Sequence, residues 1–128
     1  MLKSNATLAK LFIVATPIGN RQDISSRALT ILADCSALVC EHPHHSKKLL
    51  HGFGIVKQKV FALTDYASDG KIDAILALCK EPGGVVYISD AGSPCISDPG
   101  CLLVARAHQQ GVFVSSIPGP CAVISAIA

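Results

Sequence analysis

Short apolar runs recur along the chain, and each is followed by a turn and then by a helical pattern. Most of these runs are continuously apolar rather than alternating, which is typical of strands covered by helices on both faces. The expected strands are residues 11–15, 37–40, 59–63, 85–89 and 112–117. Five strand-helix repeats predict an α/β fold, with a mostly parallel sheet, helices on both faces and right-handed crossovers.

Helical patterns fill the segments between the expected strands. The third pattern places Ile72, Ile75 and Leu76 on one face, behind a cap at Ser68 or Asp69. The expected helices are residues 25–33, 46–51, 69–79, 98–111 and a segment from 120 onward. An acidic cap followed by proline starts the fourth helix, and a glycine ends it.

Length and composition restrict the class of protein. The chain has 128 residues, of which 50% are hydrophobic and 16% charged, so one domain with its own core is expected. The net charge of +2 does not indicate a strongly basic surface of the kind that binds nucleic acid. No apolar run reaches the roughly 18 residues that a membrane-spanning helix needs. The six cysteines include no Cys-x-x-Cys pair and lie in apolar settings, which predicts reduced thiols and a cytoplasmic location.

Three expected loops at the carboxyl ends of strands combine glycine and proline with small residues. They are residues 16–20, 90–100 and 118–122. Ligands of parallel sheets bind at this edge, although each loop is also compatible with an ordinary strand-to-helix turn. The Gly-rich phosphate-binding patterns are missing, and Arg21 is the only basic residue nearby, which disfavours a polyphosphate. Backbone amides for a carboxylate, and Asp90 for an amine or hydroxyls, suit a zwitterionic nucleoside-like ligand.

Several blocks of sequence in and around these loops resemble those of a known protein family. VATPIGN at 14–20, SDAGSP at 89–94, ISDPG at 96–100 and PGP at 118–120 resemble the ribosomal RNA small subunit methyltransferase I family. That family is a branch of the tetrapyrrole methylase superfamily. The resemblance extends, in order, from about residue 11 to the end of the chain.

The resemblance implies S-adenosylmethionine as methyl donor and the 2'-oxygen of a cytidine in small-subunit ribosomal RNA as acceptor. It implies strand order 3-2-4-1-5, a homodimer, and residues 1–128 as the N-terminal of two α/β domains, with the C-terminal domain absent from this chain. The donor residues carried over are Pro17, Ile18, Asp90, Ala91, Gly92, Ser93, Ile96, Cys121 and Ala122.

The chain departs from the family after the second strand, where relatives read CEDTR and this chain reads CEHPH at 40–44. We interpret Pro43 as stiffening this loop. Glu41 is the candidate base, with a solvated loop carboxylate as the alternative. His42, His44 and His45 raise a zinc hypothesis, but no second cluster has matching spacing, so surface histidines and no metal are expected.

The pair Lys47-Lys48 is expected either to contact RNA phosphates or to lie on the solvent-exposed face of its helix. Two other functions stay open. A corrin or porphyrin precursor is one alternative acceptor, although the first loop lacks the glycine-rich start usual in that branch. A non-catalytic binding or dimerisation fragment is the other, motivated by the altered loop at 41–44 and the missing second half.

Overall fold

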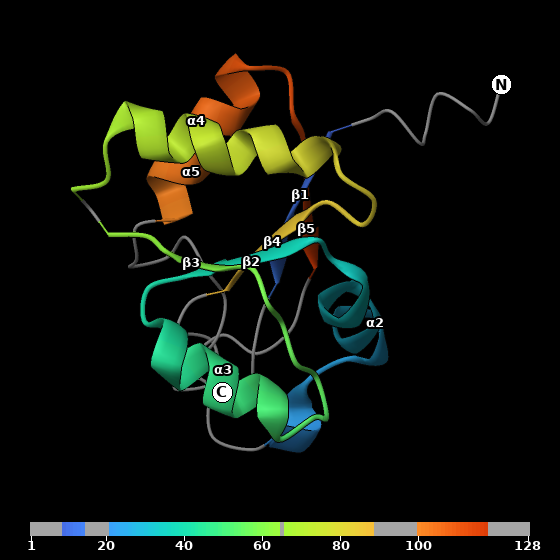
Figure 1. Ribbon diagram of the computed structural model, residues 1–128. Coiled ribbons are helices and arrows are strands. Elements are labelled where there is room, and N and C mark those ends of the chain that lie inside the picture. The colour runs from blue at the N-terminus through green and yellow to red at the C-terminus, as the bar shows by residue number, and fades with distance from the viewer. Residues whose placement is uncertain (1–8, 15–20, 65, 89–99, 118–128) are drawn as a thin grey trace, which may run out of the picture.

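The computed structural model describes residues 9–14, 21–64, 66–88 and 100–117 (Figure 1). Within these residues five strands alternate with helices. The elements are β1 (Lys10–Val14), η1 (Arg21–Asp23), α2 (Ser26–Asp34), β2 (Ala37–Cys40), α3 (Pro43–His51), β3 (Val60–Ala62), α4 (Asp69–Ala77), η2 (Leu78–Lys80), β4 (Val85–Ile88), α5 (Gly100–Gln109) and β5 (Phe113–Ile117).

The strands form one sheet in the order β3-β2-β4-β1-β5, which confirms the expected order. Every pairing in the described residues is parallel. The register aligns Val14 with Ile117, and Cys40 with both Ile88 and Ala62. The carboxyl ends of all five strands therefore lie level at one edge of the sheet.

Helices cover both faces of the sheet, as expected. Figure 1 shows α4 and α5 above the strands and α2 and α3 below them. Val85 and Tyr87 of β4 belong to the core under α4 and α5, whereas Val86 and Ile88 belong to the core of α2 and α3. All four are fully buried. Burial on both faces explains why the strands are continuously apolar in the sequence.

Serine side chains fix the start of two helices. The Ser25 hydroxyl accepts a hydrogen bond from the backbone amide of Ala28 at 3.0 Å, at the start of α2. The Ser68 hydroxyl accepts one from the amide of Lys71 at 3.2 Å, at the start of α4. These bonds satisfy amides that have no partner inside a helix, so Ser68 is confirmed as a cap.

The second helix begins earlier than expected. α3 starts at Pro43 and not at Ser46, so the interpretation of Pro43 as a loop residue is wrong. Proline suits the first helical position because its backbone nitrogen needs no acceptor there. His44 and His45 consequently lie in the first turn of α3.

The cysteines in the described residues are free. Cys35, Cys40 and Cys79 are buried, and Cys101 is exposed. Burial raises the pKa of the Cys79 thiol to about 11, so this thiol stays protonated and packs as a small apolar group. None of the helices in the described part of the chain is long and apolar enough to cross a membrane.

Candidate functional site

The three strands that precede the predicted ligand loops are neighbours in the sheet. β1 lies between β4 and β5, and each of the three strands ends in a buried residue, Val14, Ile88 and Ile117. Val14 pairs directly with Ile117, and Ile13 with Tyr87. The ends of these three strands therefore lie side by side, at the edge where parallel sheets bind ligands.

The nine predicted donor residues follow these strand ends but lie outside the described residues. They are Pro17, Ile18, Asp90, Ala91, Gly92, Ser93, Ile96, Cys121 and Ala122. The structure therefore supplies the frame of the predicted site, and the side chains within it stay a prediction.

Glu41 stands at the same edge. It follows Cys40, the last residue of β2, and Cys40 pairs with Ile88 of the adjacent β4. Its side chain is half-buried and has an interaction partner. Glu41 therefore lies next to the end of β4, and its role as a base stays a prediction.

The histidines after Glu41 lie on the surface. His42 is exposed and precedes α3, and its side chain does not cap the helix. His44 and His45 are exposed in the first turn. Among the described residues, no three His, Cys, Asp or Glu side chains are placed to hold a metal ion.

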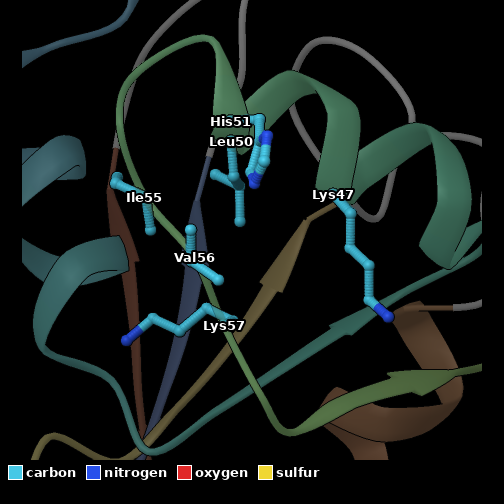
Figure 2. Close-up of a pocket in the computed structure, with 6 residues that line it drawn as sticks. All are labelled: Lys47, Leu50, His51, Ile55, Val56 and Lys57. Atoms are coloured by element: carbon cyan, nitrogen blue, oxygen red, sulfur yellow. The ribbon is translucent and has the colours of Figure 1, made fainter.

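A pocket of about 200 Å³ lies between α3 and the segment that follows it. In Figure 2, Leu50, Ile55 and Val56 lie between Lys47 and the ammonium group of Lys57, and the two ammonium groups point to opposite sides. The sequence did not predict this pocket.

Lys57 fixes one wall of the pocket. Its Nζ donates hydrogen bonds to the backbone oxygens of Ala33 and Cys35, both at 2.7 Å. These carbonyls lie at the carboxyl end of α2, where the helix dipole favours a cation. Lys57 therefore ties the segment after α3 to α2.

Comparison with known sequences assigns the fold to a family. Residues 10–128 match the sequence model described as Tetrapyrrole (Corrin/Porphyrin) Methylases. The chain belongs to the tetrapyrrole methylase family. The match includes the three segments that follow β1, β4 and β5, and all nine predicted donor residues fall within it.

Curated relatives within this family are named ribosomal RNA small subunit methyltransferase I, which confirms the resemblance. The chain is 42% identical to the Escherichia coli O157:H7 protein over 92% of this chain and 41% of that protein. It is 44% identical to the Haemophilus influenzae protein, over 91% of this chain and 41% of that protein. It is 40% identical to the Thermotoga maritima protein, over 94% of this chain and 54% of that protein. The chain thus spans about two-fifths to one-half of the length of these relatives.

Solved structures of tetrapyrrole methylases share the fold. Two structures of uroporphyrin-III C-methyltransferase from Thermus thermophilus match with TM-scores of 0.67 and 0.64, at 14% and 19% identity. The matches cover 91% and 93% of this chain, and 51% and 50% of those chains. At this identity the likeness concerns the architecture of the tetrapyrrole methylase domain alone.

Proposed function

We propose that this chain forms the S-adenosylmethionine-binding part of a small-subunit ribosomal RNA methyltransferase. The observation that carries the proposal is the side-by-side arrangement of the ends of β4, β1 and β5, where the family-matched loops begin. The 40–44% identity to proteins named ribosomal RNA small subunit methyltransferase I supports RNA as the acceptor. The corrin-type alternative has support from the family description and from a shared fold.

The chemistry of the three segments fits this donor. S-adenosylmethionine carries a carboxylate, an amine, ribose hydroxyls and an activated methyl group. Backbone amides in these segments of glycine, proline and small residues suit the carboxylate, and Asp90 suits the amine or the hydroxyls. The strands before these segments end in the buried apolar residues Val14, Ile88 and Ile117, which would give the site an apolar floor. Pro17, Ile18 and Ile96 would contact the donor, with Ala91, Gly92, Ser93, Cys121 and Ala122.

Methyl transfer to a ribose 2'-oxygen of cytidine is an in-line displacement, so the positioning of the two reactants contributes most of the rate. The ribose oxygen forms a bond to the methyl carbon while the carbon-sulfur bond breaks and its electron pair stays on sulfur. The hydroxyl proton must leave, and Glu41 is the group at this edge that would accept it. In this proposal, residues 1–128 act as an N-terminal domain in a homodimer, and a second domain closes the donor cleft.

Calorimetric titration of the full-length protein with S-adenosylmethionine tests donor binding. We expect saturable heat, and we expect Asp90→Asn to weaken binding by about tenfold because a charge-assisted hydrogen bond is lost. Asp34→Asn removes the same charge from the exposed end of α2 and is expected to leave the affinity unchanged. An absence of heat with the wild-type full-length protein at high micromolar donor would contradict the proposal.

Transfer of a labelled methyl group identifies the acceptor. The full-length protein is expected to label small ribosomal subunits and not tetrapyrrole precursors, and Glu41→Gln is expected to slow transfer without weakening donor binding. Labelling of tetrapyrrole precursors alone would favour the corrin-type alternative. Normal transfer by the isolated 128 residues would exclude the view that they form a non-catalytic fragment.

A further inference from the structure

The exposed side of α3 presents only nitrogen-bearing side chains. Successive helical residues are rotated by about 100°, so five of the nine residues fall on a continuous arc of roughly 160°. These five residues are His44, His45, Lys47, Lys48 and His51, and all are exposed. Ser46 and Leu50 occupy the opposite, buried side. We refer to the five exposed residues as the α3 stripe.

Negative charge is missing from α3 itself. The helix PHHSKKLLH contains no acidic residue, and its first turn carries histidines where acidic side chains would complement the helix dipole. Glu41, which precedes the helix, is the nearest carboxylate in the sequence. An anion drawn to the stripe therefore meets two lysines, imidazole donors and the positive end of a helix dipole.

The α3 stripe connects the carboxyl edge of the sheet to the pocket of Figure 2. Two residues separate the helix from β2, and its nine residues extend for about 13 Å. Lys47 and His51 belong both to the stripe and to the lining of the pocket. A chain of phosphates that leaves the proposed methylation edge can thus follow α3 and reach the pocket at its far end.

The size of the pocket restricts its ligand. About 200 Å³ is below the roughly 300–1,000 Å³ of sites for drug-sized molecules, so the pocket suits one ring system and not a whole methyl donor. Leu50, Ile55 and Val56 provide apolar walls, and Val56 is 68% exposed. Apolar walls beside Lys47 and His51 match the flat face of a nucleobase and its adjoining phosphate.

We propose that α3 and this pocket bind single-stranded RNA, with phosphates on the α3 stripe and one base between Leu50, Ile55 and Val56. The inference rests on the proposed function, because it assigns a place to the RNA beside the methylated nucleotide. Stacking of bases on side chains, together with phosphate contacts, is the usual basis of single-strand recognition, and here the apolar walls of the pocket would take the place of the stacking surface.

Fluorescence anisotropy with a labelled 12-nucleotide single-stranded RNA tests the stripe. Lys47→Ala with Lys48→Ala is expected to weaken binding about tenfold and to lower the slope of log K against log salt by about 1.4, since each phosphate contact contributes about 0.7. Lys71→Ala with Lys80→Ala removes two exposed lysines near the other face and is expected to change affinity less than twofold. An equal loss of RNA affinity in the two double variants, or no RNA binding by the wild-type chain, would overturn the inference.

A base-free RNA backbone of the same length tests the pocket. The wild-type chain is expected to prefer the normal RNA by about fivefold, because burying a base against apolar walls contributes on the order of that factor. Val56→Asn is expected to abolish this preference, whereas Leu102→Asn, at an exposed leucine on α5, is expected to keep it. A preference that survives Val56→Asn, or tighter binding to phosphatidylserine vesicles than to RNA, would overturn the inference.

Donor titration separates this inference from the function on which it rests. Donor binding with an RNA affinity that is insensitive to α3 overturns the RNA site and leaves the donor site standing. RNA binding through α3 without heat on donor titration overturns the donor site and leaves the RNA site standing. Circular dichroism of each variant checks that it is folded, and the exposed positions chosen make folding the expected result.

Discussion

Gly84 stands where the turn before β4 passes close to the start of β1. Its φ is +69°, and a Cβ on this residue would lie 2.6 Å from the carbonyl oxygen of Lys10. The preceding Gly83 also has a positive φ, and a Cβ there would overlap the Asp34 carbonyl at the end of α2. The turn therefore needs glycine both for its conformation and for space.

Two glycine substitutions separate these requirements. Gly84→Ala is expected to lower the free energy of unfolding by about 2–4 kcal/mol, because it combines a strained φ with a clash against backbone. Gly54→Ala has a similar φ of +75° with nothing within 4 Å, and is expected to cost only about 1 kcal/mol. Urea unfolding of both variants measures the difference. Equal losses would show that backbone conformation alone determines the cost.

At the scale of elements, an ion pair joins α4 to α5. Arg106 Nε and Nη2 donate hydrogen bonds to the two carboxylate oxygens of Asp73 at 2.9 and 3.0 Å, and Gln110 Nε2 donates to Asp73 Oδ1 at 2.5 Å. The hydrogen bonds from Arg106, followed by the one from Gln110, hold the pKa of the Asp73 carboxyl below its usual value.

This pKa shift predicts an acid-dependent contribution to stability. Because the folded-state pKa of Asp73 is lowered, the contribution is present above the unfolded pKa of about 3.9 and is lost as the pH falls through the folded pKa. The melting temperature of the wild-type chain is therefore expected to fall more steeply than that of Asp73→Asn between about pH 5 and pH 3. Glu81→Gln, at an exposed carboxylate near β4, is expected to keep the wild-type slope. Parallel curves for wild type and Asp73→Asn would contradict the prediction.

The sequence predicts the strands well and the site less well. In the described part of the chain, the expected and observed strand boundaries agree within one residue. Where a strand is buried on both faces, the apolar run in the sequence has about the same length as the strand. The start of α3 was missed because His42-Pro43 is equally compatible with a loop and with a first helical turn. With that start wrong, the spacing that unites His44, Lys48 and His51 on one face was hidden.

The pocket was beyond sequence reasoning for a different reason. It depends on where the segment containing Ile55 and Val56 lies against α3, and Lys57 sets that position through carbonyls of α2, more than 20 residues earlier in the chain. A contact of that kind has no local periodicity from which it could be predicted. The family resemblance, in contrast, predicts donor loops, because the blocks that carry it are contiguous in the sequence.

At the scale of the whole molecule, one sheet supports two separate cores. Alternate residues of β4 supply both, with Tyr87 in the core of α4 and α5 and Val86 in the core of α2 and α3. Removing apolar volume on either face alters the packing of the same strand. The two faces are therefore expected to unfold together, so that a substitution that destabilises one core also destabilises the other.

Two buried leucines test this coupling. Leu103→Ala, in the core with Tyr87, and Leu32→Ala, in the opposite core, are each expected to lower the free energy of unfolding by about 2–5 kcal/mol. The chain has two tyrosines and no tryptophan, and Tyr66 is 95% exposed, so Tyr66→Phe leaves buried Tyr87 as the fluorescent reporter of its own core. In that background both leucine variants are expected to shift the fluorescence and circular dichroism midpoints equally. If Leu32→Ala moved the circular dichroism midpoint and left the Tyr87 midpoint in place, the two faces would be independent, and the carboxyl edge between them could not act as one rigid frame for the proposed donor site.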